Sequence, residues 1–194
     1  MKYLKIFLIV LLFTFSKAQS QSGGLFLSAD DFQKRTYSVE VVDGTISIGT
    51  ANSLVVKDEN GKKKYPFENV VGYSYNGELF RAYGKKSTFG NYGFYKIEDQ
   101  SGLIIYSHPV FVPKSGVVQA YYYSLSYHSP IKELSRKNLM QDFVFNKEML
   151  SYLIETRNSK LMEKVHGKFA VNEAMERFHV RVADGVIKPT SDSL

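Results

Sequence analysis

Glycine-containing turn signals recur along the middle of this chain and separate short runs of strand-forming residues. Asn60-Gly61 and Asn76-Gly77 each lie between two such runs, and so does Asp43-Gly44 in the stretch SVEVVDGTISIG. These dipeptides favour type I′ hairpin turns, because both central residues of that turn need a positive φ. Residues 100–102, Gln-Ser-Gly, mark a fourth bend. Connections this short predict antiparallel neighbours, since parallel strands need a long crossover.

Residues 19–128 are therefore predicted to form an antiparallel β domain, a meander in a curled sheet or a partly open barrel. The stretch 71–84, VGYSYNGELFRAYG, fits this pattern as scaffold. The last strand, from 116 to 128, alternates in side-chain size, which is typical of a sheet with one packed face. One face of that strand is expected to carry Val117, Tyr121, Tyr123, Leu125 and Tyr127.

Helix signals follow residue 128, so residues 129–183 are predicted to form a C-terminal region of about three helices. Ser135 and Asn146 are candidate N-caps in this region, and Ser28 is a candidate N-cap for a helical turn earlier in the chain. A last helix is predicted over 169–182, ended by Asp184-Gly185, and residues 184–194 are expected to be a disordered tail. Strands followed by helices predict the α+β class.

The first eighteen residues have the layout of a secretory signal peptide. Lys2 and Lys5 precede an apolar run over 6–15, and Ser16 and Ala18 suit the −3 and −1 positions of a cleavage site. The run is shorter than the ~20 residues of a membrane-spanning helix. We expect export to the periplasm or the medium, with no transmembrane span after cleavage. The chain has no cysteine, so a lipoprotein anchor, disulfides and thiolate sites are excluded.

The formal net charge of +6 falls to +3 once Lys2, Lys5 and Lys17 leave with the signal peptide (6 − 3 = 3). The visible basic clusters are Lys62-Lys63-Lys64 and Lys85-Lys86. One interpretation is a solvated turn that keeps strand edges from pairing with other chains. The alternative is a patch for anionic glycans or lipid headgroups. Nucleic acid is not expected as a partner, because so few basic residues cluster.

Catalytic and cofactor motifs are absent from the sequence, so no cofactor and no enzymatic activity are expected. There is no nucleophile elbow, no phosphate-binding loop and no pair of histidines at the spacing of a zinc site. His108 and His128 each end a predicted strand and are interpreted as surface residues. A hydrolase with a dispersed site would need one of them beside a carboxylate and a serine.

Tyrosine and phenylalanine, fourteen of each, are the unusual feature of the composition. Tyrosine on a sheet either covers a half-buried face or offers a stacking surface for a ligand. Arg81 either stacks between tyrosines or extends from the sheet edge. The candidate binding residues are Arg81, Lys85, Lys86, Tyr121, Tyr123 and Tyr127.

Two motifs resemble those of uncharacterised secreted proteins of Bacteroidota. The first is GLFLSADDF over 24–32, and the second is VVGYSYNGELFRAY over 70–83. The ending SKAQS of the first segment also resembles the signal peptides of that phylum. The resemblance implies an exported protein with strands followed by helices, and it implies no activity. The sequence thus predicts a non-catalytic envelope protein that binds another protein, or alternatively a glycan- or lipid-binding β module.

Overall fold

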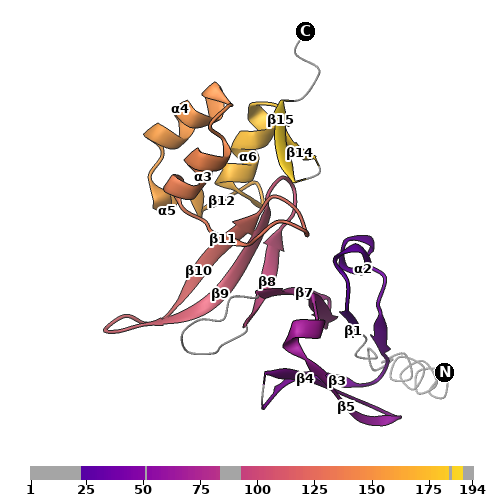
Figure 1. The fold of residues 1–194 in the computed structure, drawn as a ribbon. Coiled ribbons are helices and arrows are strands. Elements are labelled where there is room, and N and C mark those ends of the chain that lie inside the picture. Colours follow the sequence, from indigo (N-terminus) through magenta and orange to yellow (C-terminus); the bar gives the residue numbers. More distant parts are fainter. Residues whose placement is uncertain (1–22, 51, 84–92, 184, 190–194) are drawn as a thin grey trace, which may run out of the picture.

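The computed structural model describes residues 23–50, 52–83, 93–183 and 185–189 (Figure 1). The predicted signal peptide, Lys85 and Lys86 lie outside the described residues. The main feature is an eight-stranded antiparallel sheet in the order β11-β10-β9-β8-β7-β6-β1-β2. Its strands are β1 (Gly23–Phe26), β2 (Val39–Val41), β6 (Gly72–Tyr75), β7 (Glu78–Tyr83), β8 (Gly93–Asp99), β9 (Ile104–Val112), β10 (Gly116–Ser124) and β11 (Lys132–Glu133).

The predicted α+β class and the antiparallel pairing are confirmed. Strands β6 to β11 follow one another as a meander, as expected, whereas β1 lies between β6 and β2. The sheet ends at β2 and β11 and is not closed into a barrel. The expected hairpin turn at Asn76-Gly77 is present, with φ of 52° and 76° at the two residues.

A second sheet of three strands, β3 (Thr45–Gly49), β4 (Ser53–Asp58) and β5 (Gly61–Pro66), pairs in the order β3-β4-β5. The predicted hairpin at Asp43-Gly44 is wrong, because β2 pairs with β1 and β3 pairs with β4. Asp43 has a positive φ but Gly44 does not, so no type I′ turn forms. A Cβ at Gly44 would lie 2.5 Å from the Lys57 carbonyl oxygen, so glycine here allows the chain to pass between sheets.

The first described strand, β1, was not predicted from its polar, glycine-rich surroundings. All four of its residues are buried, and it pairs with β2 on one side and β6 on the other. The helical turn after it, α2 (Ala29–Lys34), is capped as predicted: the Asp31 N–H donates to Ser28 Oγ at 3.0 Å. A 3₁₀ turn, η1 (Phe67–Asn69), links β5 to β6.

The C-terminal region holds four helices in the described chain, rather than about three. They are α3 (Arg136–Asp142), α4 (Lys147–Glu155), α5 (Asn158–Leu161) and α6 (Ala170–Arg177). The predicted caps at Ser135 and Asn146 are confirmed, since each accepts a backbone N–H three residues on. A short ladder, β12 (Lys164–Val165) with β13 (Lys168–Phe169), precedes α6.

The prediction of a helix to residue 182 and a disordered tail from 184 is wrong for this part of the chain. Helix α6 ends before His179, whose φ is 52°. The next residues form a hairpin of β14 (Val180–Ala183) and β15 (Val186–Pro189). Val180 is buried, and Val182 and Ile187 pack beside it against the helical core, so burial holds the hairpin in place. Residues 190–194 lie outside the described residues.

Three hydrophobic clusters hold the layers together. One lies between the C-terminal helices and strands β9 and β10 of the large sheet and includes Ile105, Tyr123 and Phe143. A second lies between the three-stranded sheet and the β1–β7 end, and a third lies on the opposite face under α2. Figure 1 shows α3–α6 at one end of the molecule and β3–β5 at the other. No helix among the described residues is long and apolar enough to span a membrane.

Candidate functional site

The Arg81 side chain is buried and connects strand β7 to the chain that follows β10. It lies on β7, a strand with partners on both sides, and its side chain packs over the ring of Tyr106. The alternative in which Arg81 extends from the sheet edge is therefore wrong, and its side chain contacts the ring of one tyrosine, Tyr106. The guanidinium donates at 2.7–3.3 Å to Tyr106 Oη, Ser124 Oγ and the carbonyl oxygens of Ser126, Tyr127 and Ser129. Its hydrogen bonds go to the chain after β10, so Arg81 fixes that loop against the sheet.

Tyr121 and Tyr123 lie beneath the helices. Tyr121 packs against Phe169, and Tyr123 is fully buried. Tyr123 Oη donates to Asp142 Oδ2 at 2.6 Å, and Lys132 Nζ donates to Asp142 Oδ1 at 2.5 Å. Burial, reinforced by Asp142, raises the pKa of Tyr123 well above its usual value. These tyrosines belong to the core and do not form an open face for a ligand.

Tyr127 lies in a different cluster from Tyr121 and Tyr123, contrary to the expectation of a shared face. Strand β10 ends at Ser124, and the chain then turns. The Tyr127 ring packs edge-on against Phe32 in the cluster under α2. Its hydroxyl donates to Gln100 and accepts from Arg35. The predicted binding residues that the structure describes are thus brought into two separate cores.

The two histidines predicted to end strands have separate surroundings, and His108 lies within β9 and not at its end. His108 packs against Tyr95, and burial lowers its pKa. His128 Nε2 lies 3.4 Å from Asp30 Oδ1, and both side chains are largely exposed. Within the described ranges, no group of three or more acidic or histidine side chains is placed to hold a metal ion.

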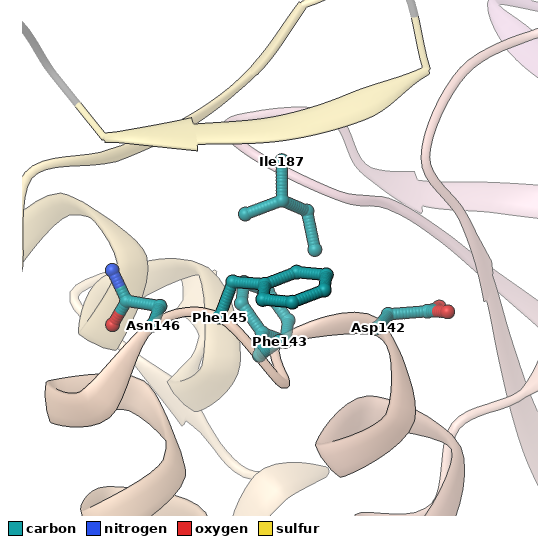
Figure 2. A pocket seen from close by; sticks show the side chains of 5 residues that line it. All are labelled: Asp142, Phe143, Phe145, Asn146 and Ile187. Atoms are coloured by element: carbon teal, nitrogen blue, oxygen red, sulfur yellow. The ribbon is translucent and has the colours of Figure 1, made fainter.

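A small pocket lies beside the turn that joins α3 to α4. Figure 2 shows Phe143, Phe145 and Asn146 on that turn, with Ile187 of β15 facing them across the pocket. Its volume is about 90 Å³, whereas sites for small molecules usually measure about 300–1,000 Å³. The Phe145 side chain is 98% exposed. The pocket therefore suits a few water molecules, and Phe145 is an aromatic side chain offered to solvent.

The distal half of the β9–β10 hairpin forms the largest exposed apolar feature of the main sheet. We call residues 109–119 the hairpin tip. Phe111 and Val117 lie directly opposite each other across the two strands, and their exposed fractions are 75% and 71%. Val112 and Val118 are also exposed. In Figure 1 this hairpin extends well beyond the helical layer. The tip therefore presents apolar side chains that nothing in the described chain covers.

The outer edge of β10 is also open along the tip. Strand β11 pairs only with Tyr122 and Tyr123. No strand that the structure describes pairs with Gly116–Ala120 from that side. The backbone N–H and C=O groups of an unpaired edge can bind a further strand. The hairpin tip thus combines exposed apolar side chains with a free strand edge.

Sequence reasoning missed both exposed features. The alternating pattern of residues 116–127 correctly places Val117 on the same face as Tyr123. The pattern does not show that the helices bury Tyr123 and leave Val117 exposed. A signal was available in the run PVFVPKSGVV over 109–118, which is apolar on both strands around a turn. A contiguous exposed apolar patch is typical of an interaction site, so such a run around a turn is a candidate for one.

Comparison with known proteins does not assign a family. No protein-family model, no curated protein and no solved structure matches the chain.

Proposed function

We propose that this chain is an exported, non-catalytic envelope protein that binds another protein through the hairpin tip. The proposal of export rests on the signal-like start of the sequence, and the non-catalytic role rests on its lack of catalytic motifs. The single observation that supports the docking surface is the Phe111–Val117 pair, which is directly opposed across two strands and largely exposed.

Exposed apolar pairs of this kind support a binding role because they contribute little to folding. The core of a protein interface is rich in aromatic and aliphatic side chains, and phenylalanine is enriched there. Phe111 can serve as an anchor that enters a pocket of the partner, with Val117 beside it. The edge of β10 next to this pair can add a partner strand by main-chain hydrogen bonds. The two features lie on one hairpin, so one partner segment can use both.

The alternative, a ligand site on the tyrosine face, has less support. Tyr123 is fully buried and hydrogen-bonded to Asp142, and Tyr121 packs on Phe169. A sugar ring would have to displace the helices in order to stack on these rings. Lys85 and Lys86 lie outside the described residues, so they add nothing to this alternative.

Site-specific photo-crosslinking in the native host tests the proposal. A photoreactive amino acid replaces Phe111 in one variant and Phe145 in a matched control, since both are highly exposed phenylalanines. We expect a discrete crosslinked protein from position 111 and none from position 145. The crosslink should disappear when Val117 is also changed to Ser. Crosslinking at 145 alone would move the docking surface to the helices and contradict the proposal.

A further inference from the structure

The outward face of the three-stranded sheet carries a compact group of lysines. Side chains of this sheet alternate between an inner face, where Ile46, Leu54 and Val56 are buried against the main sheet, and an outer face. On the outer face the polar side chains are exposed, while Val55 between them is buried. The outer face carries Lys57, Lys62 and Lys64 with two hydroxyl residues, Thr45 and Ser47. These five side chains line one shallow depression of about 620 Å³.

The pairing register brings two of these lysines together. Lys57 of β4 lies directly opposite Lys62 of β5, and Lys64 follows Lys62 on the same face of β5. Side chains directly opposite on neighbouring strands have Cβ atoms about 5 Å apart, and like charges in that position destabilise the pair. The fold therefore places two like-charged residues directly opposite each other, an arrangement that costs stability.

These lysines are not paired with a carboxylate among the described residues. Within the described ranges, no ion pair involves Lys57, Lys62 or Lys64. The nearest acid in sequence, Asp58, alternates to the inner face and accepts the backbone N–H of Asn60. The contrast with the rest of the molecule is clear, because several other lysines have a carboxylate oxygen within 3.5 Å: Lys96, Lys132, Lys160, Lys164 and Lys168.

Protection of a strand edge explains only part of this arrangement. Strand β5 is the edge of its sheet, and lysines on an edge strand discourage pairing with other chains. Edge protection accounts for Lys62, Lys63 and Lys64, although these residues lie within strand β5 and not in a turn as predicted. It does not cover Lys57, because β4 is the central strand and has no free edge.

We propose that Lys57, Lys62 and Lys64 bind a phosphoryl group, either free in solution or carried by an anionic lipid headgroup. The three ammonium groups supply positive charge and hydrogen-bond donors, and the hydroxyls of Thr45 and Ser47 supply further donors beside them. The lysines form a short triangle and not a long stripe, which suits one compact anion better than a polymer. The shallow, open shape of the depression admits a group presented from a flat surface. This site is separate from the hairpin tip and does not depend on its role.

Titration with inorganic phosphate, followed by amide NMR of the exported chain, tests the site. We expect the amide signals of Ser47, Lys57 and Lys62 to move with phosphate and to stay in place with chloride at equal ionic strength. The double variant Lys57→Gln/Lys62→Gln should weaken phosphate binding about tenfold or more, since each lysine near an anion contributes about a fivefold factor. Unchanged signals in the wild type would overturn the proposal.

The matched control is Lys63→Gln/Lys137→Gln, which removes the same charge elsewhere. Lys63 lies on the same strand but over the ring of Tyr65 on the other face, and Lys137 is exposed on α3. We expect this control to bind phosphate within about twofold of the wild type. An equal loss in both double variants would mean a net-charge effect only and would overturn the site. Phosphate should also raise the melting temperature of the wild type but not of Lys57→Gln/Lys62→Gln.

Vesicle sedimentation distinguishes the two sources of the phosphoryl group. Vesicles of phosphatidylcholine with phosphatidylglycerol are compared with vesicles of phosphatidylcholine alone. Binding to the anionic vesicles that is lost in Lys57→Gln/Lys62→Gln identifies a lipid headgroup. A response to inorganic phosphate without vesicle binding identifies a soluble phosphate compound and still supports the site. No response to either overturns it.

Discussion

The base and the tip of the β9–β10 hairpin are built alike but lie in different surroundings. At the base, Ile105 and Tyr123 oppose each other and are fully buried; at the tip, Phe111 and Val117 oppose each other and are mostly exposed. The two pairs are six residues apart on each strand, so they share one face of the hairpin and are separated by about 20 Å. The helices cover the base only (Figure 1). The comparison shows that the apolar face of this hairpin continues beyond the layer that buries it.

This difference separates a folding role from a binding role within one element. The base pair belongs to the cluster that joins the sheet to the helices, where burial stabilises the fold. The tip pair has no such cluster around it in the described chain, so its apolar character does not serve the core. The same strand-forming residues thus stabilise the fold at one end and remain available to a partner at the other.

The largest effect is expected from Arg81, which fixes the base through Tyr106 and Ser124. Arg81→Met should lower the free energy of unfolding by about 4 kcal/mol or more, because it leaves several buried oxygens without their donor. Arg81→Lys keeps the charge but cannot reach as many acceptors, so a smaller loss is expected. Urea denaturation measures both. If Arg81→Met lowered the free energy of unfolding by less than about 1 kcal/mol, the loop after β10 would not depend on Arg81 for its position.

The second prediction concerns the stability cost of truncating one side chain at the base and one at the tip of β9. Ile105→Ala should cost about 2–5 kcal/mol, because it opens a cavity in a packed core. Phe111→Ala should change stability by less than about 0.5 kcal/mol, as exposed substitutions do, although it removes a larger side chain. Urea denaturation of the two variants gives the difference directly. Equal losses would mean that the tip is covered in solution, and the comparison would fail.

The smallest effect concerns the Tyr123 hydroxyl at the base. At pH 7, Tyr123→Phe should cost about 1 kcal/mol, because the hydrogen bond to Asp142 is lost. The pKa of Tyr123 is raised in the folded protein, so its stabilising contribution is complete below the unfolded value of about 10 and falls as the pH rises above it. For this residue the fall is about 1.4 kcal/mol per pH unit.

Denaturation at pH 7 and pH 11 therefore tests this assignment. The deficit of Tyr123→Phe relative to the wild type should disappear at pH 11, where the wild type loses the contribution of its buried hydroxyl. A deficit that is the same at both pH values would show that Tyr123 ionises as readily in the folded chain as in the unfolded one.

Local signals in the sequence predicted the elements well where a single residue controls the geometry. Asn76-Gly77 forms its hairpin, and Ser28, Ser135 and Asn146 cap their helices. Asp43-Gly44 gave the wrong pairing, because a turn signal does not specify whether the following strand returns to the same sheet. The helix predicted to residue 182 failed because Val180 is buried in the helical core as part of a hairpin.

The candidate site was less predictable. Of the residues singled out from the sequence, Arg81 and Tyr123 are buried for structural reasons, and Tyr127 belongs to another cluster. The hairpin tip was not recognised, because alternation in a strand has the same form whether its face is covered or open. The lysine face was visible as Lys62-Lys63-Lys64, but the role of Lys57 depends on the pairing register of β4 with β5.

The sequence by itself determined the class of this protein, the antiparallel nature of its main sheet and the starts of several helices. These features follow from steric limits on φ, from side-chain capping and from alternation, which act over a few residues. Only the tertiary structure decided which apolar faces are covered, which cations lack a partner and where β1 enters the sheet. Those outcomes depend on contacts between residues far apart in the chain. No local sequence pattern specifies which helix or sheet packs against a given face.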